Sequence, residues 1–239
     1  MSRSKLAVTI ALTAAASAAA GALAVSWRLT RPQQVVANYH RWYHRNGATT
    51  YNNTRWLGVE MQKCPMDTWI FQELLFEVAP DVMVETGTYK GGSSFYYASL
   101  MDLLRRGRVL TVDIEDYPGK PQHPRITFFL GSSTSPEILA RLRAAIAPGE
   151  KVMVTLDSDH HAAHVGEELK LYSELVTPGS YLIVEDTHFN GRPILPKFGP
   201  GPFEAVEAFL RTHSNFERDR SREKFGMTFN PGGWLKRVR

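Results

Sequence analysis

The chain has 239 residues and a formal charge of +4, from 28 lysine and arginine residues against 24 aspartate and glutamate residues. This length allows one domain of about 200 residues with its own core. Residues 1–31 carry four basic residues and no acid, whereas residues 32–239 are formally neutral. A nucleic-acid partner is not expected, because it requires a basic face on the folded part. The single cysteine, Cys64, excludes an internal disulfide framework and a cysteine-rich metal site.

A hydrophobic segment lies near the start of the chain. Residues 6–27 are a run of 22 uncharged residues, ten of them alanine, with basic residues on both sides. As a helix this run would be about 33 Å long, enough to cross the core of a bilayer. It predicts a membrane anchor. The small residues Ala22 and Ala24 also fit a cleaved signal peptide, and an alanine-rich helix without a membrane role is a third interpretation. The basic residues after the run outnumber those before it, which favours a cytoplasmic catalytic domain over export.

The chain beyond this segment reads as alternating helices and strands. An aromatic-rich stretch at 33–46 predicts an amphipathic helix, and Asp67 is expected to cap a helix that runs to Glu77. Apolar runs predict strands at 81–86, 108–114, 125–130, 151–157 and 180–185, with weaker candidates at 216–218 and 226–229. The patterns between them predict helices at 92–105, 134–146, 161–175 and 203–213.

This alternation predicts the fold class. Strands that are nearly all apolar, each followed by a helix, form a parallel sheet covered on both faces. We therefore expect a doubly wound α/β fold with a mostly parallel seven-stranded sheet and a ligand crevice at the carboxyl ends of its central strands. Residues 1–31 are expected to be the anchor or signal segment, 32–80 an N-terminal helical cap and 81–239 the catalytic domain.

Three strand ends carry residues suited to a nucleoside. The first strand runs into a glycine-containing turn that starts at Glu85, where the backbone can approach a ligand and a new helix N-terminus favours negative charge. The turn is not G-x-G-x-x-G, so it does not support a dinucleotide fingerprint. Asp113 ends the second strand, where an acid binds ribose hydroxyls, and Ser132 follows the third, where it can flank an adenine. Each feature also occurs as plain structure, but together they predict a nucleoside pocket.

Four carboxylates follow the fourth and fifth strands: Asp157, Asp159, Glu185 and Asp186. At neighbouring strand ends they would repel one another, so a hard divalent cation such as Mg²⁺ is the natural partner. Oxygen ligands argue against zinc and iron. His160 lies three residues after Asp157, close enough to serve as a general base beside the metal. His161 and His164 fit the helix surface or packing, and the role of His188 stays open.

A loop rich in proline and glycine follows the fifth strand. Residues 190–202 contain four prolines and three glycines, which exclude a helix or an inner strand. A loop of this length in a compact domain is typical of a lid or binding loop, with a rigid surface crossing as the alternative. Pro202 is expected to start the next helix.

These residues resemble class I S-adenosylmethionine-dependent, Mg²⁺-dependent O-methyltransferases, and more closely the cephalosporin hydroxylase / rhamnosyl O-methyltransferase family. The resemblance covers about residues 50–237 and includes the order and spacing of the motifs. It rests on Trp56-Leu57-Gly58, Gln62-Lys63-Cys64-Pro65, Glu85-Thr86-Gly87, Gly91-Gly92-Ser93, Asp157-Ser158-Asp159-His160, Glu185-Asp186-Thr187 and Asn230-Pro231-Gly232-Gly233. It implies a Rossmann-like methyltransferase domain.

The resemblance also implies roles for single residues. The E-x-G-x-Y-x-G-x-S pattern of catechol-type methyltransferases places these residues around the cofactor: Glu85, Gly87, Tyr89, Gly91 and Ser93. Asp113 matches the ribose-binding acid, and Glu185 and Asp186 match two metal ligands. The third ligand is Asp157 if His160 is the base of a D-x-x-H pattern, or Asp159 by a different spacing; we favour Asp157. The implied reaction is Mg²⁺-assisted removal of a hydroxyl proton by His160, followed by methyl transfer.

Other functions stay open at this point. A nicotinamide-dependent oxidoreductase fits the fold class but lacks the glycine fingerprint, and a non-catalytic membrane-tethered binding module would keep the pocket without the reaction. The acceptor is expected to be a small molecule, a glycan or a glycolipid. The aromatic helix at 33–46 is a candidate contact for a homo-oligomer.

Overall fold

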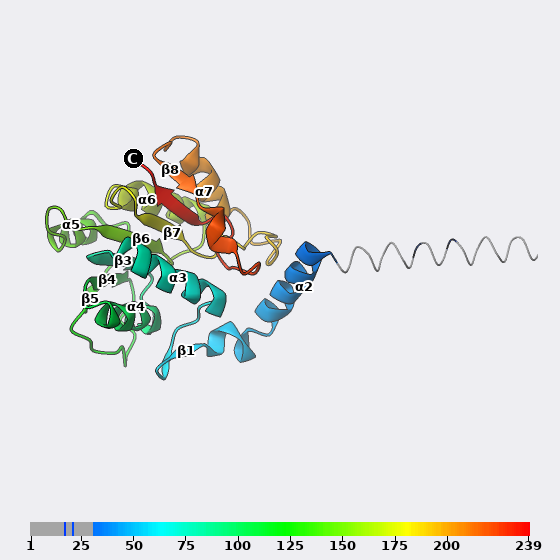
Figure 1. Ribbon diagram of the computed structural model, residues 1–239, viewed down its shortest axis with the longest axis horizontal. Coiled ribbons are helices and arrows are strands. Elements are labelled where there is room, and N and C mark those ends of the chain that lie inside the picture. The colour runs from blue at the N-terminus through cyan, green and yellow to red at the C-terminus, as the bar shows by residue number, and fades with distance from the viewer. Residues whose placement is uncertain (1–16, 18–20, 22–30) are drawn as a thin grey trace, which may run out of the picture.

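Seven strands form one sheet with helices on both faces in the computed structural model, which describes residues 17, 21 and 31–239 (Figure 1). The predicted anchor or signal segment at 1–31 lies almost wholly outside the described residues. Within the described part of the chain, no helix has both the length and the apolar character needed to cross a bilayer.

The sheet has the strand order β5-β4-β3-β6-β7-β9-β8. Its five parallel strands are β3 (Val82–Thr86), β4 (Arg108–Asp113), β5 (Ile126–Leu130), β6 (Val152–Leu156) and β7 (Tyr181–Val184). β9 (Trp234–Arg237) runs antiparallel to both β7 and β8 (Phe216–Arg218). Every residue of β3, β6 and β7 is buried, as expected for strands covered on both faces.

The parallel register brings four strand ends to one edge. Thr86 pairs with Val112 on one side and with Leu156 on the other, and Leu156 pairs with Val184. The residues that follow these positions therefore meet at the carboxyl edge of the sheet, where a ligand crevice is expected.

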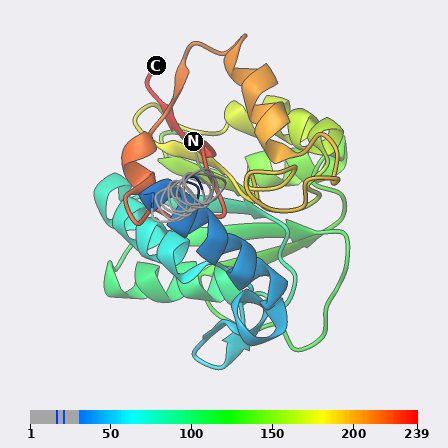
Figure 2. The same ribbon diagram turned by 90° about the vertical axis from the view of Figure 1, so that its right-hand side faces the viewer.

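Two helical layers cover the sheet (Figure 2). α3 (Pro65–Val78) and α4 (Gly92–Leu103) pack on the face that presents Met83, Met153 and Ile183. The opposite face presents alternate residues of the same strands, among them Val84 and Val154. It is covered by α5 (Pro136–Ala144), α6 (Ala162–Ser173) and α7 (Pro202–Leu210). The predicted fold class, doubly wound with a mostly parallel seven-stranded sheet, is confirmed.

Two local predictions are wrong. Asp67 does not cap α3: the N-cap is Cys64 with Pro65 as the first helical residue, and the buried Asp67 carboxylate accepts a hydrogen bond from the Phe229 backbone N–H at 2.7 Å. The stretch at 226–229 is not a strand, because its apolar side chains pack outside the sheet, and the last strand is β9 instead.

An N-terminal layer covers one end of the carboxyl edge. It contains α2 (Pro32–Arg45), the 3-10 helices Gly47–Thr49 and Tyr51–Asn53, and a short hairpin of β1 (Arg55–Trp56) and β2 (Val59–Glu60). A small core of Tyr43, Cys64, Met227 and Phe229 joins this layer to the C-terminal loops. The hairpin approaches α4 so closely that a Cβ on Gly92 would lie 2.0 Å from the Glu60 carbonyl oxygen. These contacts hold the layer against the site.

Candidate active site

The turn after β3 is built around a glycine that no other residue can replace without movement. Gly87 has φ +85°, and a Cβ there would lie 1.9 Å from the Asp157 backbone oxygen. The Asp157 backbone N–H in turn donates to the Thr86 carbonyl oxygen at 3.0 Å. The turn after β3 and the loop after β6 are therefore in direct backbone contact.

Asp113, at the end of β4, accepts hydrogen bonds that shape the neighbouring turns. Its Oδ2 accepts a hydrogen bond from the Tyr89 N–H at 2.7 Å, and its Oδ1 accepts one from the Glu115 N–H at 3.0 Å. Tyr89 has φ +47°, an uncommon conformation for a bulky residue that this carboxylate stabilises. Asp113 thus shapes the turn at the edge of the cavity.

One cavity of about 790 Å³ runs along these strand ends. Five of the predicted cofactor residues line it: Gly87, Tyr89, Ser93, Asp113 and Ser132. Two do not. Gly91 caps the N-terminus of α4, and Glu85 is fully buried, where its Oε2 accepts hydrogen bonds from Ser94 and from Thr111. The second oxygen of Glu85, Oε1, has no hydrogen-bond partner among the described residues.

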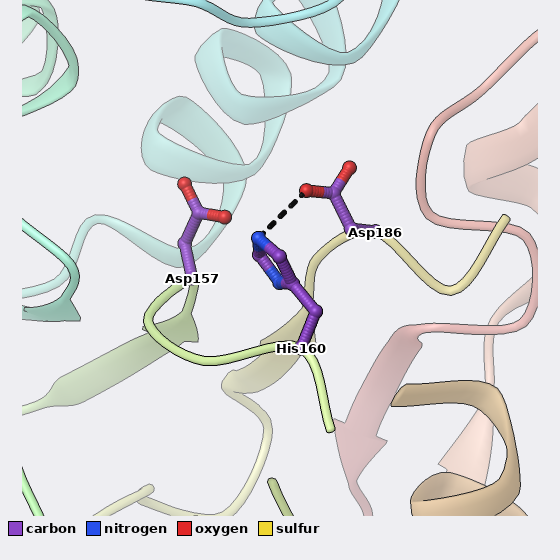
Figure 3. Close-up of side chains that lie close together, drawn as sticks. All are labelled: Asp157, His160 and Asp186. Carbon is purple, nitrogen blue, oxygen red and sulfur yellow. Dashed lines mark ion pairs between the residues drawn. The ribbon is translucent and has the colours of Figure 1, made fainter. Parts of the chain in front are cut away.

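The same cavity contains an acidic cluster (Figure 3). Ligand atoms of Asp157, His160 and Asp186 all lie within 4.8 Å of one another. His160 Nε2 is 3.3 Å from Asp186 Oδ2, and the Asp157 carboxylate approaches from the other side of the imidazole ring. Asp186 has φ +54°, and this left-handed turn directs its side chain into the cavity instead of along β7.

The other two predicted metal ligands lie outside this cluster. Glu185 is buried, where its Oε1 accepts hydrogen bonds from Thr155 Oγ1 at 2.8 Å and from a lysine at 2.6 Å. Asp159 is half-exposed, and its Oδ1 accepts a hydrogen bond from the His161 backbone N–H at 2.7 Å and contacts that ring at the same distance. Of the two aspartates that the sequence left open, only Asp157 faces the cluster.

Lys63 is the lysine that the sequence did not single out. Its buried Nζ forms ion pairs with Asp157 Oδ2 and with Glu185 Oε1. Burial alone would lower the pKa of Lys63, but the Asp157 and Glu185 carboxylates raise it above its usual value. Burial also raises the pKa of both carboxyl groups, since it disfavours their charged forms. The Lys63 ammonium is therefore a buried positive charge next to the cluster of Asp157, His160 and Asp186.

Two histidines support Asp186 from the side of the N-terminal layer. His188 Nε2 lies 3.0 Å from Asp186 Oδ1, and His188 Nδ1 lies 2.8 Å from Nε2 of His40 on α2. Burial and then the neighbouring His188 lower the pKa of His40 to about 3, so His40 is neutral. Burial opposes ionisation of Asp186, but His160 and His188 bring its pKa below the usual value. This chain of contacts links α2 to the cluster.

Aromatic side chains form another part of the cavity wall. Phe189 and Phe198 are in contact at 4.8 Å between ring centroids, and His161 stacks on Phe198 at 5.1 Å. Phe198 belongs to the loop at 190–202, which has no helix or strand and leads into α7 at Pro202 as predicted. The loop therefore contributes directly to the cavity.

Known proteins resemble this chain over most of its length. A family model described as Rhamnosyl O-methyltransferase/CmcI matches residues 48–238. A rhamnosyl O-methyltransferase of Mycobacterium leprae is 40% identical over 221 residues, which cover 89% of this chain and 95% of the relative. A rhamnosyl O-methyltransferase of Mycobacterium tuberculosis is 41% identical over 217 residues, 87% of each chain.

Solved structures of CmcI show the same fold. A ligand-free structure aligns with a TM-score of 0.61 at 22% identity, over 79% of this chain and 77% of that chain. A CmcI structure with Mg and S-adenosylmethionine aligns with a TM-score of 0.60 at 21% identity, over 79% and 78% of the two chains. The matches confirm the family and the enzyme class, an O-methyltransferase, that the sequence resembled. The chain belongs to the Rhamnosyl O-methyltransferase/CmcI family.

Proposed function

We propose that this protein uses S-adenosylmethionine and Mg²⁺ to methylate a hydroxyl group of a sugar, carried on a glycolipid, a glycan or a secondary metabolite. The observation that carries the proposal is that one cavity contains both the predicted cofactor turn and the cluster of Asp157, His160 and Asp186. The name of the mycobacterial relatives supports a sugar acceptor, and the CmcI structure with Mg and S-adenosylmethionine supports both cofactors.

The residues of the cluster fit a magnesium ion. Mg²⁺ binds through one or two carboxylates and keeps several waters, and here two carboxylates, Asp157 and Asp186, face one open cavity. Burial and the neighbouring Asp186 both disfavour the charged form of Asp157, and Lys63 pairs with one of its two oxygens, so a divalent cation would lower the remaining electrostatic cost.

The residues around the turn after β3 fit S-adenosylmethionine. Gly87, Tyr89 and Ser93 line the cavity at this turn, where the glycine lets the backbone approach a ligand. Asp113 lies at the end of β4, where an acid binds ribose hydroxyls, and Ser132 lines the same end of the cavity.

The chain then divides the work of the reaction. When bound, S-adenosylmethionine supplies the methyl group and Mg²⁺ acidifies the acceptor hydroxyl. Asp157 and Asp186 would hold the cation, and His160 would accept the hydroxyl proton. Lys63 holds Asp157 from behind, and the aromatic wall excludes water and orients the acceptor.

A pair of aspartates two positions apart tests the metal assignment. Asp157→Asn should abolish calorimetric Mg²⁺ binding and reduce kcat by at least about 100-fold, because it removes a charged ligand. Asp159→Asn is the matched control, and its activity should stay within about threefold of the parent, since the Asp159 carboxylate pairs with His161 and does not face the cluster. Methyl transfer is measured as the incorporation of one labelled methyl group into glycan or membrane-lipid extracts. The opposite ranking of the two variants would assign the metal to Asp159.

We also propose that residues 1–31 anchor the protein in a membrane with the catalytic domain on the cytoplasmic side. The uncharged run and its basic flanks support this location, and cytoplasm supplies the proposed cofactor. The alternative is export after cleavage of a signal peptide. The mass of the mature protein distinguishes the two, because cleavage would remove the segment.

A further inference from the structure

Helix α2 has two faces with different surroundings. His40 and Tyr43 are buried against the C-terminal loops and the site. Val35, Tyr39 and Trp42 lie on the other side of the helix at spacings of four and three residues, and they are 50%, 44% and 50% exposed. The Tyr39 and Trp42 rings stack at 5.8 Å. We call these three residues the outward face of α2; among the described residues, no segment covers it.

The charged residues in the N-terminal part of the chain, which includes α2, are all basic. The first 59 residues contain seven basic residues and no acid, whereas the remaining 180 contain 21 basic and 24 acidic residues. Two of the seven, Arg41 and Arg45, are exposed on α2. They hydrogen-bond to backbone and amide oxygens, and neither has a carboxylate partner within 4.0 Å in the described part of the chain. Their charge is therefore not neutralised by the protein.

The position of α2 in the chain points to the same surroundings. The helix begins at Pro32, and only four residues separate it from the uncharged run at 6–27. Figure 1 shows α2 at the side of the molecule, with its Pro32 end farthest from the sheet. Figure 2, which looks onto that side of the molecule, shows α2 in front of the other described elements. An exposed aromatic stripe next to basic residues is typical of a helix that lies in the interface of an anionic membrane.

We propose that the outward face of α2 docks on the surface of an anionic phospholipid bilayer. Val35, Tyr39 and Trp42 enter the interface, and Arg41 and Arg45 contact lipid phosphates. Docking is distinct from anchoring by residues 1–31, since it concerns a helix that also contacts the site through His40 and His188. It would hold the supporting side of the active site against the membrane surface.

A single fluorescent label on the full chain tests this surface. The only native thiol, Cys64, is 1% exposed, so an introduced surface cysteine is labelled selectively. Tyr39→Cys carries an environment-sensitive dye, and Leu103→Cys, at an 80% exposed position on α4, is the matched control. Both proteins are mixed with phosphatidylcholine vesicles with or without phosphatidylglycerol, some containing brominated lipid as a quencher.

We expect the dye at position 39 to shift to the blue and to be quenched in anionic vesicles, while the dye at position 103 is unchanged. Anchoring by residues 1–31 alone would bring both proteins to the vesicles without this local difference. A dye at position 39 that stays in water on vesicle-bound protein would overturn the proposal. A shift that appears without vesicles and grows with protein concentration would also overturn it, because it would identify a second copy as the occupant.

Charge reversal separates the contribution of the arginines. In the labelled Tyr39→Cys protein, Arg41→Glu with Arg45→Glu should lower quenching in anionic vesicles to the level seen at position 103. Arg105→Glu with Arg211→Glu, both at exposed positions elsewhere, is the control and should leave quenching unchanged. Equal effects of the two pairs would contradict docking through α2. None of these measurements uses a methyl acceptor, so a failure of the proposed reaction does not affect them.

Discussion

At the scale of single residues, Lys63 balances the charge of two carboxylates in the site. Glu185 and Asp157 are acids whose burial opposes ionisation, and the Lys63 ammonium pairs with both of them. A buried charge that loses its partner is strongly destabilising, whereas a pair that stays complete is close to neutral. Lys63 is therefore expected to matter most when no divalent cation is present to share its role.

Replacing Lys63 tests this expectation. Lys63→Met should lower the free energy of unfolding by about 3–5 kcal/mol in metal-free buffer, because Glu185 and Asp157 lose their buried cation. Added Mg²⁺ should recover more stability in this variant than in the parent protein, since a divalent ion neutralises the same carboxylates. Urea denaturation with and without Mg²⁺ measures both effects.

Lys170→Met is the matched control, because Lys170 forms an exposed ion pair with Glu167 on α6. Its stability should stay within about 0.5 kcal/mol of the parent, with no dependence on Mg²⁺. If Lys63→Met behaves like Lys170→Met, the buried ion pairs do not stabilise the protein.

The site residues differ in how far sequence could predict them. Asp113, Asp157 and Asp186 were predictable because each lies at or just after the end of a strand, and parallel strands end at one edge. Lys63 lies 94 residues before Asp157, in a loop where a lysine usually faces solvent. No pattern in the sequence signals its partners, beyond its place in the Gln62-Lys63-Cys64-Pro65 motif. The separation of Asp186 from Glu185 depends on a left-handed turn that residue types do not specify.

At the scale of elements, the first turn of α3 is tied to the C-terminal loops by Asp67. Its carboxylate accepts a hydrogen bond from the Phe229 backbone N–H, and the neighbouring Cys64 belongs to the small core with Met227 and Phe229. Burial raises the pKa of Asp67 to about 7 from an ordinary value of 3.8, although hydrogen bonds from Thr228 and Phe229 oppose the shift. This contact therefore depends on pH.

The sign of that dependence follows from proton binding. Between pH 3.8 and about 7 the folded protein holds a proton on Asp67 that the unfolded chain has released. The contribution of Asp67 to stability therefore falls as pH rises through this window, by up to about 1.4 kcal/mol per pH unit, and is level above it. Asp67→Asn should remove this part of the pH dependence, so parent and variant free energies of unfolding should converge or cross between pH 5 and 8. Parallel curves from denaturation at several pH values would contradict it.

The elements themselves were largely predictable, and the exceptions have a physical cause. The five parallel strands and the helices α4 to α7 occur within a few residues of the expected ranges, because buried strands are continuous apolar runs. The stretch at 226–229 is also apolar, but its side chains Met227 and Phe229 pack against Tyr43 instead of joining the sheet. Apolar residues show that a segment is buried, and only the tertiary fold decides which core receives them.

At the scale of the whole molecule, main-chain atoms connect the proposed cofactor site to the proposed metal site. Gly87, in the proposed cofactor turn, rests against the carbonyl group of Asp157, the first residue of the proposed metal loop. Gly87→Ala should weaken calorimetric binding of S-adenosylmethionine and of Mg²⁺ together, because the added Cβ forces the two loops apart. The size expected is at least about tenfold for each ligand.

Gly179→Ala is the control for the backbone conformation alone. Gly179 also has a positive φ, +83°, but among the described residues no atom beyond its chain neighbours lies within 4 Å of a Cβ placed there. This variant should lose about 1–2 kcal/mol of stability and bind both ligands normally. If Gly87→Ala weakens the binding of only one ligand, the geometry of the cofactor site does not depend on that of the metal site.

The contact between Gly87 and Asp157 also bears on how acceptors can change within such an enzyme. Methyl transfer demands a narrow spacing between the carbon that moves and the oxygen that receives it, and here that spacing is inherited from main-chain atoms of adjacent strands β3 and β6. Side chains of the 190–202 loop, such as Phe198, line the same cavity and can vary without altering this main-chain contact. Specificity for new acceptors is thus expected to arise from changes in the 190–202 loop, while the contact between Gly87 and Asp157 stays the same.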